Sequence, residues 1–275
     1  MKSPHSFVYF GTPEVARATL AQLLEAGFVP SAVVTNPDAP SGRGMELHVS
    51  PVKTLALEKN IPVLTPEKLD AAAIEEIKKY ACDYAVVVAY GKIFPQALID
   101  VFPRGALNCH YSLLPKYRGA APVEAALLAG ERETGVTIQQ LVLKMDAGDI
   151  LSEHSLPIDP TDTVRELFPK LIALGATLLL ETLPKFEAGE LLPRAQDESR
   201  ASYARKIKKE EGLLDLAGDP RQNWNKYRAY LMRPGTYFIE NGTRNKITKA
   251  SYQNGRFIIE RVIPENGHEI NYHSV

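Results

Sequence analysis

Short apolar runs alternate along the first 190 residues with stretches in which apolar side chains recur every three to four positions. The short runs are typical of strands that are buried on both faces, and the periodic stretches are typical of helices that connect them. Residues 83–89 form the clearest central strand. The pattern therefore predicts an α/β fold with a Rossmann-like, mostly parallel sheet and flanking helices. The other expected strands are 6–10, 31–35, 61–64 and 106–110, and the expected helices are 15–24, 51–59, 66–80 and 121–128.

The pattern changes after residue 135, where two paired strands, 136–143 and 150–157, precede a long amphipathic helix over 163–187. A polar stretch then separates this region from a helix and several short strands near the C-terminus. We therefore expect a catalytic domain over 1–190, a linker over 191–204, and a small, shortened OB-like β domain over 205–275. The short elements expected in the last domain are a helix over 221–230 and strands over 234–238, 246–250 and 256–262.

The composition limits the class of protein only loosely. The 275 residues include 45% hydrophobic and 24% charged types, which is ordinary for one large domain plus a small one. The net charge is -1, but residues 203–275 contain 13 Lys and Arg against 8 Asp and Glu. This positive excess fits a segment that meets a polyanion, and it also fits ordinary surface variation.

Cysteine content and hydropathy bear on location. Cys82 and Cys109 are the two cysteines, so the sequence has neither a disulfide framework nor a CxxC pair. No stretch approaches 18 consecutive apolar residues, and the N-terminal apolar run is too short for a signal peptide. We expect a cytoplasmic protein that neither spans nor binds a membrane.

Several common kinds of site are excluded by their motifs. The turn after the first strand reads Phe10-Gly11-Thr12-Pro13-Glu14 and lacks the GxGxxG of a dinucleotide site. The six histidines have no metal-ligand spacing, and neither GxSxG nor a Walker loop occurs. We therefore expect no metal.

A long loop at residues 36–44 carries one cation, Arg43, between two glycines. Loops of this length without regular structure are often functional. Glycines would let the loop lie against a nucleic-acid backbone while Arg43 binds a phosphate. The alternative is an ordinary surface loop with a solvated Arg43.

The candidate catalytic residues follow the strand over 106–110. Asn108 and His110 are two positions apart, so their side chains leave the same face at the carboxyl end of the strand, where open α/β sheets bind ligands. Cys109 faces the other way and is expected to be a small buried residue. Asp146 follows in a turn, where a His-Asp pair and an ordinary hairpin turn are both possible.

Further motifs support these candidates together. The pairing of Asn-x-His with a downstream Asp resembles the folate-dependent formyltransferases, and the Arg43 loop followed by 50–53 resembles the members that act on methionyl-tRNA. The resemblance covers most of the chain. The matching motifs are Phe10-Gly11-Thr12-Pro13, Gly42-Arg43-Gly44, Ser50-Pro51-Val52-Lys53, Val88-Ala89-Tyr90-Gly91, residues 108–119, Glu133-Thr134-Gly135-Val136-Thr137 and Asp146-x-Gly148-Asp149.

The resemblance implies that 10-formyltetrahydrofolate is the donor and that the α-amino group of initiator methionyl-tRNA is the acceptor. It also assigns the site: catalytic Asn108, His110 and Asp146; folate-binding Val88, Ala89, Tyr90, Gly91, Ser112, Leu113, Leu114 and Pro115; and tRNA-binding Arg43. The basic residues Lys206, Lys208 and Lys209 are expected to bind the tRNA as well, and a solvated linker is the alternative. We also expect a monomer.

The expected chemistry is direct attack of the amine. Negative charge then builds on the formyl oxygen, and fixed donors such as Asn108 and His110 stabilise it, while Asp146 favours a protonated His110. An amino sugar nucleotide is the alternative acceptor, and a non-catalytic folate- or RNA-binding protein is the alternative class.

Overall fold

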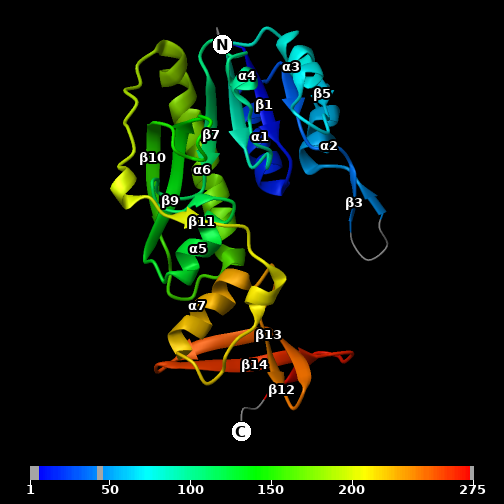
Figure 1. The fold of residues 1–275 in the computed structure, drawn as a ribbon, viewed down its shortest axis with the longest axis vertical. Coiled ribbons are helices and arrows are strands. Elements are labelled where there is room, and N and C mark those ends of the chain that lie inside the picture. The colour runs from blue at the N-terminus through cyan, green and yellow to red at the C-terminus, as the bar shows by residue number, and fades with distance from the viewer. Residues whose placement is uncertain (1–5, 42–45, 273–275) are drawn as a thin grey trace. The chain divides into compact units, whose positions relative to one another are not determined.

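The computed structural model describes residues 6–41 and 46–272 of the chain (Figure 1). These form two compact units. The first unit lies within 1–118, 135–155 and 171–201, and the second within 119–134, 156–170 and 202–275. Two segments from the middle of the chain thus belong with the C-terminal residues. The linear division at 190 and 204 stays a prediction.

The main sheet has seven strands among the described residues, in the order β10-β9-β7-β6-β1-β2-β5. The strands from β7 to β5 pair in parallel, and β9 joins β7 in antiparallel orientation. The Rossmann-like, mostly parallel sheet is confirmed. The strands are β1 (Phe7–Gly11), β2 (Ala32–Val34), β5 (Val63–Leu64), β6 (Tyr84–Val88), β7 (Ala106–His110), β9 (Glu133–Gln140) and β10 (Ile150–Pro157).

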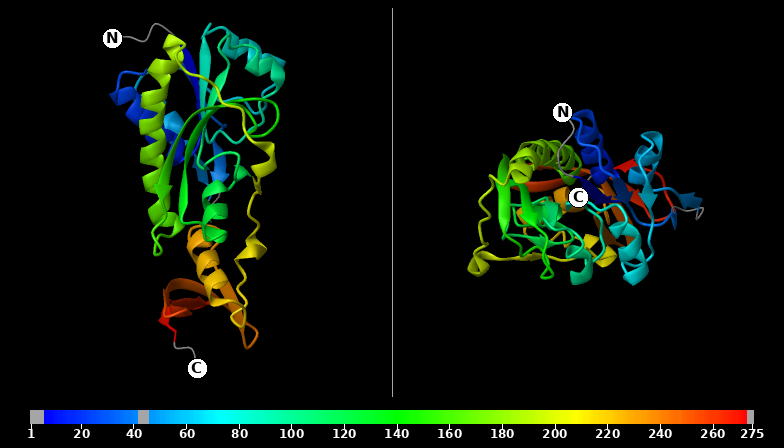
Figure 2. Two further views of the ribbon diagram at one scale, coloured as in Figure 1. Left: turned by 90° about the vertical axis from the view of Figure 1, so that its left-hand side faces the viewer. Right: turned by 90° about the horizontal axis from the view of Figure 1, so that it is seen from above.

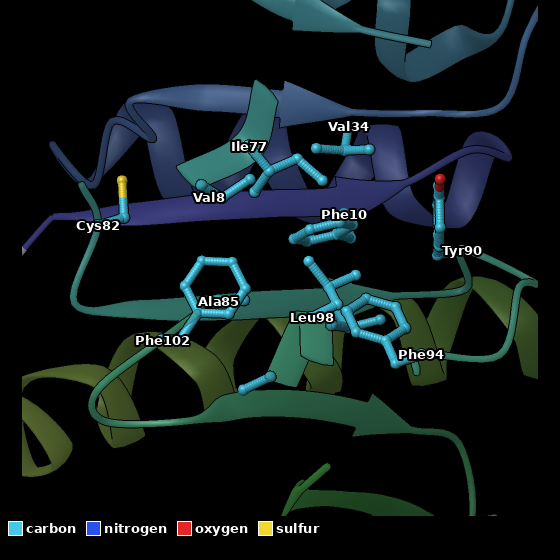
Figure 3. Packing of buried hydrophobic residues seen from close by; sticks show 12 residues of the cluster. Val8, Phe10, Val34, Ile77, Cys82, Ala85, Tyr90, Phe94, Leu98 and Phe102 are labelled. Atoms are coloured by element: carbon cyan, nitrogen blue, oxygen red, sulfur yellow. The ribbon is translucent and has the colours of Figure 1, made fainter. Parts of the chain in front are cut away.

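Helices cover both faces of this sheet (Figure 2). Phe10 packs against the rings of Tyr90 and Phe94, with centroids 5.5 and 4.9 Å away, in a buried cluster that also holds Ile77 and Leu98 from two helices (Figure 3). The long helix α6 lies on the opposite face, because its residue Gly175 approaches the Cys109 thiol. The helices of the chain are α1 (Glu14–Glu25), α2 (Pro51–Glu58), α3 (Ala71–Lys78), α4 (Gln96–Ile99), α5 (Pro122–Leu128), α6 (Val164–Ala188) and α7 (Pro220–Tyr230), with 3-10 turns at Glu198–Arg200 and Lys209–Gly212.

The second unit contains a small β-sheet, as predicted. The strands β12 (Tyr237–Glu240), β13 (Thr243–Gln253), β14 (Arg256–Pro264) and β15 (Ile270–Asn271) pair as an antiparallel meander. Trp224 and Tyr227 of α7 bury their rings against this sheet together with Phe238 and Ile259. This aromatic layer gives the sheet its hydrophobic core.

Several element boundaries differ from the expected ones for local reasons. Helix α3 begins at Ala71 rather than near residue 66, because the Asp70 carboxylate accepts a hydrogen bond from the Ala73 backbone N–H and caps the helix there. Strand β12 begins at Tyr237, three residues later than expected, and β13 extends further in both directions than residues 246–250. The loop at residues 36–44 was expected to lack regular structure, but it contains β3 (Ala39–Ser41), which pairs in antiparallel orientation with β4 (Glu46–His48), just after the loop. Two further short strands, β8 (Arg118–Gly119) and β11 (Tyr203–Ala204), pair with each other.

Helix α6 is also long and apolar enough to cross a membrane by length and composition alone, and among the described residues it is the one helix that passes this test. The core helix of a soluble protein passes the same test. Leu167, Leu171, Leu179 and Leu183 are fully buried within the protein. The helix thus has a role in the core that accounts for its apolar composition.

Candidate active site

The register between β7 and β9 places polar side chains of both strands on one face. Asn108 lies opposite Gln139, and His110 lies opposite Thr137. Because side chains alternate along a strand and opposite residues of an antiparallel pair share a face, Asn108, His110 and Gln139 project to the same side. The Cys109 thiol faces α6 on the other side, where burial raises its pKa to about 12.

Asp146 lies against this face. Of the two alternatives that the sequence allowed, a His-Asp pair and an ordinary hairpin turn, the structure has the two side chains next to each other. Its Oδ1 atom accepts hydrogen bonds from Asn108 Nδ2 at 3.3 Å and from Gln139 Nε2 at 2.9 Å. Its Oδ2 atom lies 3.7 Å from His110 Nδ1. The structure therefore brings the three predicted catalytic residues together around one carboxylate. The His110 side chain is 6% exposed and the Asp146 side chain 15% exposed, so the group is largely shielded from bulk water.

The hydrogen bond of His110 Nε2 shows that this ring nitrogen is protonated. His110 Nε2 lies 3.0 Å from the backbone carbonyl oxygen of Tyr117. A carbonyl oxygen can only accept, so Nε2 carries a hydrogen and donates it. The ring is thus oriented with Nδ1 toward Asp146. A proton on Nδ1 would lie between the imidazole and the carboxylate.

The turn that carries Asp146 is irregular. Asp146 has a φ of +48°, in the left-handed region that few side chains other than Asn and Asp tolerate. The turn closes where the Gln140 N–H donates to the Asp149 carbonyl at 2.9 Å. Gly148 is buried, and a Cβ at this position would meet the Gln140 carbonyl oxygen at 1.7 Å. A glycine is therefore required for the turn to pass this close to the end of β9.

The predicted folate segment at 88–91 follows the carboxyl end of β6, next to β7 in the sheet. Val88 and Tyr90 are buried, whereas Ala89 and Gly91 are exposed and adopt positive φ angles of +47° and +82°. The Tyr90 hydroxyl is buried without a hydrogen-bond partner among the described residues. The Tyr90 carbonyl accepts from Asn36 Nδ2 at 3.2 Å, which ties this segment to the end of β2.

The predicted folate residues 112–115 are fixed against β9. The Thr137 hydroxyl donates to the Ser112 carbonyl at 2.7 Å and accepts from the Leu114 N–H at 3.2 Å. Ser112, Leu114 and Pro115 are buried, and Leu113 is half-buried. This segment leads directly from His110 to Tyr117, so its fixed path also supports the histidine.

The three predicted tRNA-binding lysines are not part of the cluster around Asp146. Arg43 lies outside the described residues. Lys206, Lys208 and Lys209 are exposed and belong to the second unit.

Three residues of the site were missed by the sequence reasoning: Gln139, Gln196 and Arg118. Gln139 is 1% exposed, and Arg118 is fully buried. The expected strand over 136–143 contains Gln139, but only the register with β7 shows that it faces the Asn108 side chain. Arg118 and Gln196 are 78 residues apart in sequence, and no local pattern joins them.

No group of three or more His, Cys, Asp or Glu side chains in the described part of the chain could hold a metal ion. The side chains that meet at the site are the Asn108 and Gln139 amides, the His110 imidazole and the Asp146 carboxylate. These can donate to a developing oxyanion, hold a positive charge near it, and accept a proton.

Known proteins resemble this chain in sequence. The family model described as formyl transferase matches residues 6–183. A methionyl-tRNA formyltransferase of Geobacter sulfurreducens is 43% identical over 245 residues, which cover 89% of this chain and 77% of the relative. A methionyl-tRNA formyltransferase of Lactobacillus johnsonii is 42% identical and covers 89% and 78% of the two chains.

Solved structures share the fold at lower identity. The methionyl-tRNA formyltransferase of Clostridium thermocellum matches with a TM-score of 0.63 and 16% identity, over 98% of this chain and all of that one. An N-formyltransferase of Helicobacter canadensis, in complex with folinic acid and dTDP-3-aminofucose, matches with a TM-score of 0.70 and 21% identity, over 92% and 89% of the two chains. With the family model covering the sheet, the Asn108 and His110 strand and the Asp146 turn, the chain belongs to the formyl transferase family.

Proposed function

We propose that this chain transfers the formyl group of 10-formyltetrahydrofolate to the α-amino group of methionyl-tRNA, the initiator form being the acceptor. The observation that carries the proposal is the cluster of Asn108, His110 and Asp146 at the carboxyl end of β7, in a chain of the formyl transferase family. The relatives that are 42 to 43% identical over about nine-tenths of this chain are methionyl-tRNA formyltransferases, which favours this acceptor over an amino sugar nucleotide. We expect the reaction to take place in the cytoplasm, with the chain acting as a monomer.

The reaction needs no covalent intermediate on the protein. The amine nitrogen forms a bond to the formyl carbon, the bond from that carbon to the folate nitrogen breaks, the amine loses a proton and the folate nitrogen gains one. Negative charge builds on the formyl oxygen at the transition state, so donors held next to that oxygen lower the barrier.

Each residue of the cluster has a defined part in this proposal. One N–H of the Asn108 amide binds Asp146, and its second N–H is directed at the formyl oxygen. A protonated His110 provides positive charge beside that oxygen. Asp146 balances the charge of His110 and accepts the proton of the amine through water.

The substrates are assigned from position. We propose that the folate occupies the region bordered by residues 88–91 and 112–115, next to the cluster along the carboxyl ends of β6 and β7. Arg43 and the exposed Lys206, Lys208 and Lys209 are proposed to contact the tRNA phosphates, where lysine and arginine side chains replace counterions. Formyl transfer should then weaken as salt concentration rises.

The test is a formyl-transfer assay with 10-formyltetrahydrofolate and charged initiator tRNA. The unaltered chain should produce formylmethionyl-tRNA, and Asn108→Ala or His110→Ala should lower kcat by about 100-fold or more. His154→Ala is the matched control, because His154 is exposed on β10. Absence of product from the unaltered chain would refute the proposal, and transfer to an amino sugar nucleotide in its place would identify the other acceptor. Full binding of both substrates without transfer would indicate a non-catalytic binding protein.

A further inference from the structure

The segment of residues 192–200 is largely exposed, but one of its side chains points inward. Gln196 is half-buried between exposed neighbours. Its Nε2 atom donates to the backbone carbonyls of Asp146 at 2.9 Å and Gly148 at 2.7 Å. Gln196 thus holds the Asp146 turn by its main chain, from a part of the sequence 50 residues away.

Arg118 determines how the Gln196 amide is oriented. The Nε and Nη2 atoms of Arg118 donate to Gln196 Oε1 at 3.1 and 2.8 Å. A guanidinium has donors only, so it requires the amide oxygen on its side and directs the amide NH2 group toward the turn. The arrangement has one consistent pattern of donors and acceptors.

Glu198 also binds the Arg118 guanidinium and holds it in place. Its two carboxylate oxygens accept from Arg118 Nη1 at 3.2 Å and Nη2 at 2.9 Å. Hydrogen bonding by Arg118, together with Lys144, lowers the pKa of Glu198 to about 2. The carboxylate therefore stays charged, and the paired donors of the buried arginine are fixed in one direction.

Gln139 acts on the same turn through the Asp146 side chain. Its Nε2 atom donates to Asp146 Oδ1 at 2.9 Å, and its Oε1 atom lies 3.3 Å from Gln196 Nε2. The two glutamines are thus linked to each other, and between them they hold both the carboxylate and the main chain of Asp146. Because Asp146 lies in an irregular turn with a positive φ, regular strand hydrogen bonds do not fix its position.

We propose that Gln139 and Gln196, the latter oriented by Arg118, are positioning residues that hold the Asp146 carboxylate against Asn108 and His110. None of them needs to touch a substrate. The inference rests on the proposed function, since it assigns Asp146 a part in formyl transfer. The competing explanation is that the network only fastens residues 192–200 to the rest of the first unit.

The variants separate these two explanations. Gln196→Glu keeps an acceptor for Arg118, and so keeps the segment fastened, but replaces the NH2 donor with a carboxylate oxygen facing two carbonyls. Gln139→Met removes the donor to Asp146 at similar volume. Gln253→Met is the control, because Gln253 is exposed in β13 and its amide reaches only Ser251, at 3.4 Å, among the hydrogen bonds of the described residues.

We expect Gln139→Met and Gln196→Glu each to lower kcat for formyl transfer by about 10- to 100-fold, with the KM for both substrates unchanged. In an Asp146→Ala background the Gln139→Met substitution should have little further effect on kcat, because the acceptor of the Gln139 Nε2 donor is already gone. A kcat within about threefold of the unaltered chain for both glutamine variants, or a full additional loss in the Asp146→Ala background, would overturn the inference.

A second measurement does not depend on the acceptor. NMR signals of the His110 ring should shift in Gln139→Met and Gln196→Glu and stay unchanged in Gln253→Met, since only the first two displace Asp146 from the ring. If the unaltered chain fails to formylate methionyl-tRNA but these shifts occur, the proposed function is wrong and the positioning network stands. If transfer occurs but the His110 signals do not shift in the two variants, the positioning network is refuted while the proposed function stands.

Discussion

Replacement of Gly148 by Ala tests how closely the Asp146 turn is fitted to the end of β9. The added Cβ would meet the Gln140 carbonyl oxygen at 1.7 Å, whereas real Cβ atoms essentially never come within 3.0 Å of such an atom. The turn must therefore move by about 1.3 Å or more. The Gln140 carbonyl cannot move away as a flexible side chain could. Gln140 is the last residue of β9, and its N–H donates to the Asp149 carbonyl.

Gly148 is two residues from Asp146, so a displacement of the turn at Gly148 should also move the Asp146 carboxylate. A misplacement of about 1 Å at a catalytic group costs about 100-fold in rate, and a backbone collision of this kind costs about 1–3 kcal/mol of stability. Single-turnover formyl transfer and urea unfolding measure the two effects. Gly27→Ala is the control, because Gly27 has a φ of +87° but open space around its Cβ position, so it should cost only about 1 kcal/mol of stability. A Gly148→Ala chain that folds and keeps a rate within threefold of the original would show that the turn is not closely fitted.

Three further predictions concern stability and reactivity. Burial raises the pKa of the Glu124 carboxyl, so the folded chain binds the carboxyl proton more tightly than the unfolded chain does. The folded chain therefore loses stability as pH rises from about 4.3. The urea midpoint of Glu124→Gln should exceed that of the original chain at pH 7, and the difference should vanish near pH 4. Burial also raises the pKa of Cys109 to about 12, so iodoacetamide at pH 8 should leave this thiol unmodified in the folded chain and alkylate it after unfolding, as read by mass spectrometry. Ser50→Ala should lower the unfolding free energy by about 1–2 kcal/mol, because the Ser50 hydroxyl accepts from the Lys53 N–H at the start of α2 and bonds Thr35 at 2.8 Å; an unchanged urea midpoint would contradict this.

The sequence predicts the fold well where strands are buried on both faces. Strand β7 has the predicted bounds, and β6 ends one residue before the predicted end, because near-continuous runs of buried residues leave few alternative registers. Predictions failed where a polar side chain decides the boundary, as Asp70 does for α3, or where pairing occurs within a loop, as in β3 and β4. Such pairings depend on turn geometry, which composition does not reveal.

The candidate site divides in the same way. The shared face of Asn108 and His110 follows from the period of two along a strand, so the sequence alone predicts it. The contact with Asp146 depends on the path of an irregular turn and on the register of β7 with β9, and so it lay beyond sequence reasoning. The partners Arg118 and Gln196 are joined only by the folding of distant segments.

This division has a physical consequence for how the site tolerates change. Asn108 and His110 are held by the sheet, whose hydrogen bonds span several strands, so their positions should resist single surface substitutions. Asp146 is held by a few side-chain hydrogen bonds to Gln139 and Gln196, and each of these can be lost by one substitution without unfolding the sheet. Substitutions that lower kcat while leaving the fold intact should therefore be found more often around the Asp146 turn than along the core of β7.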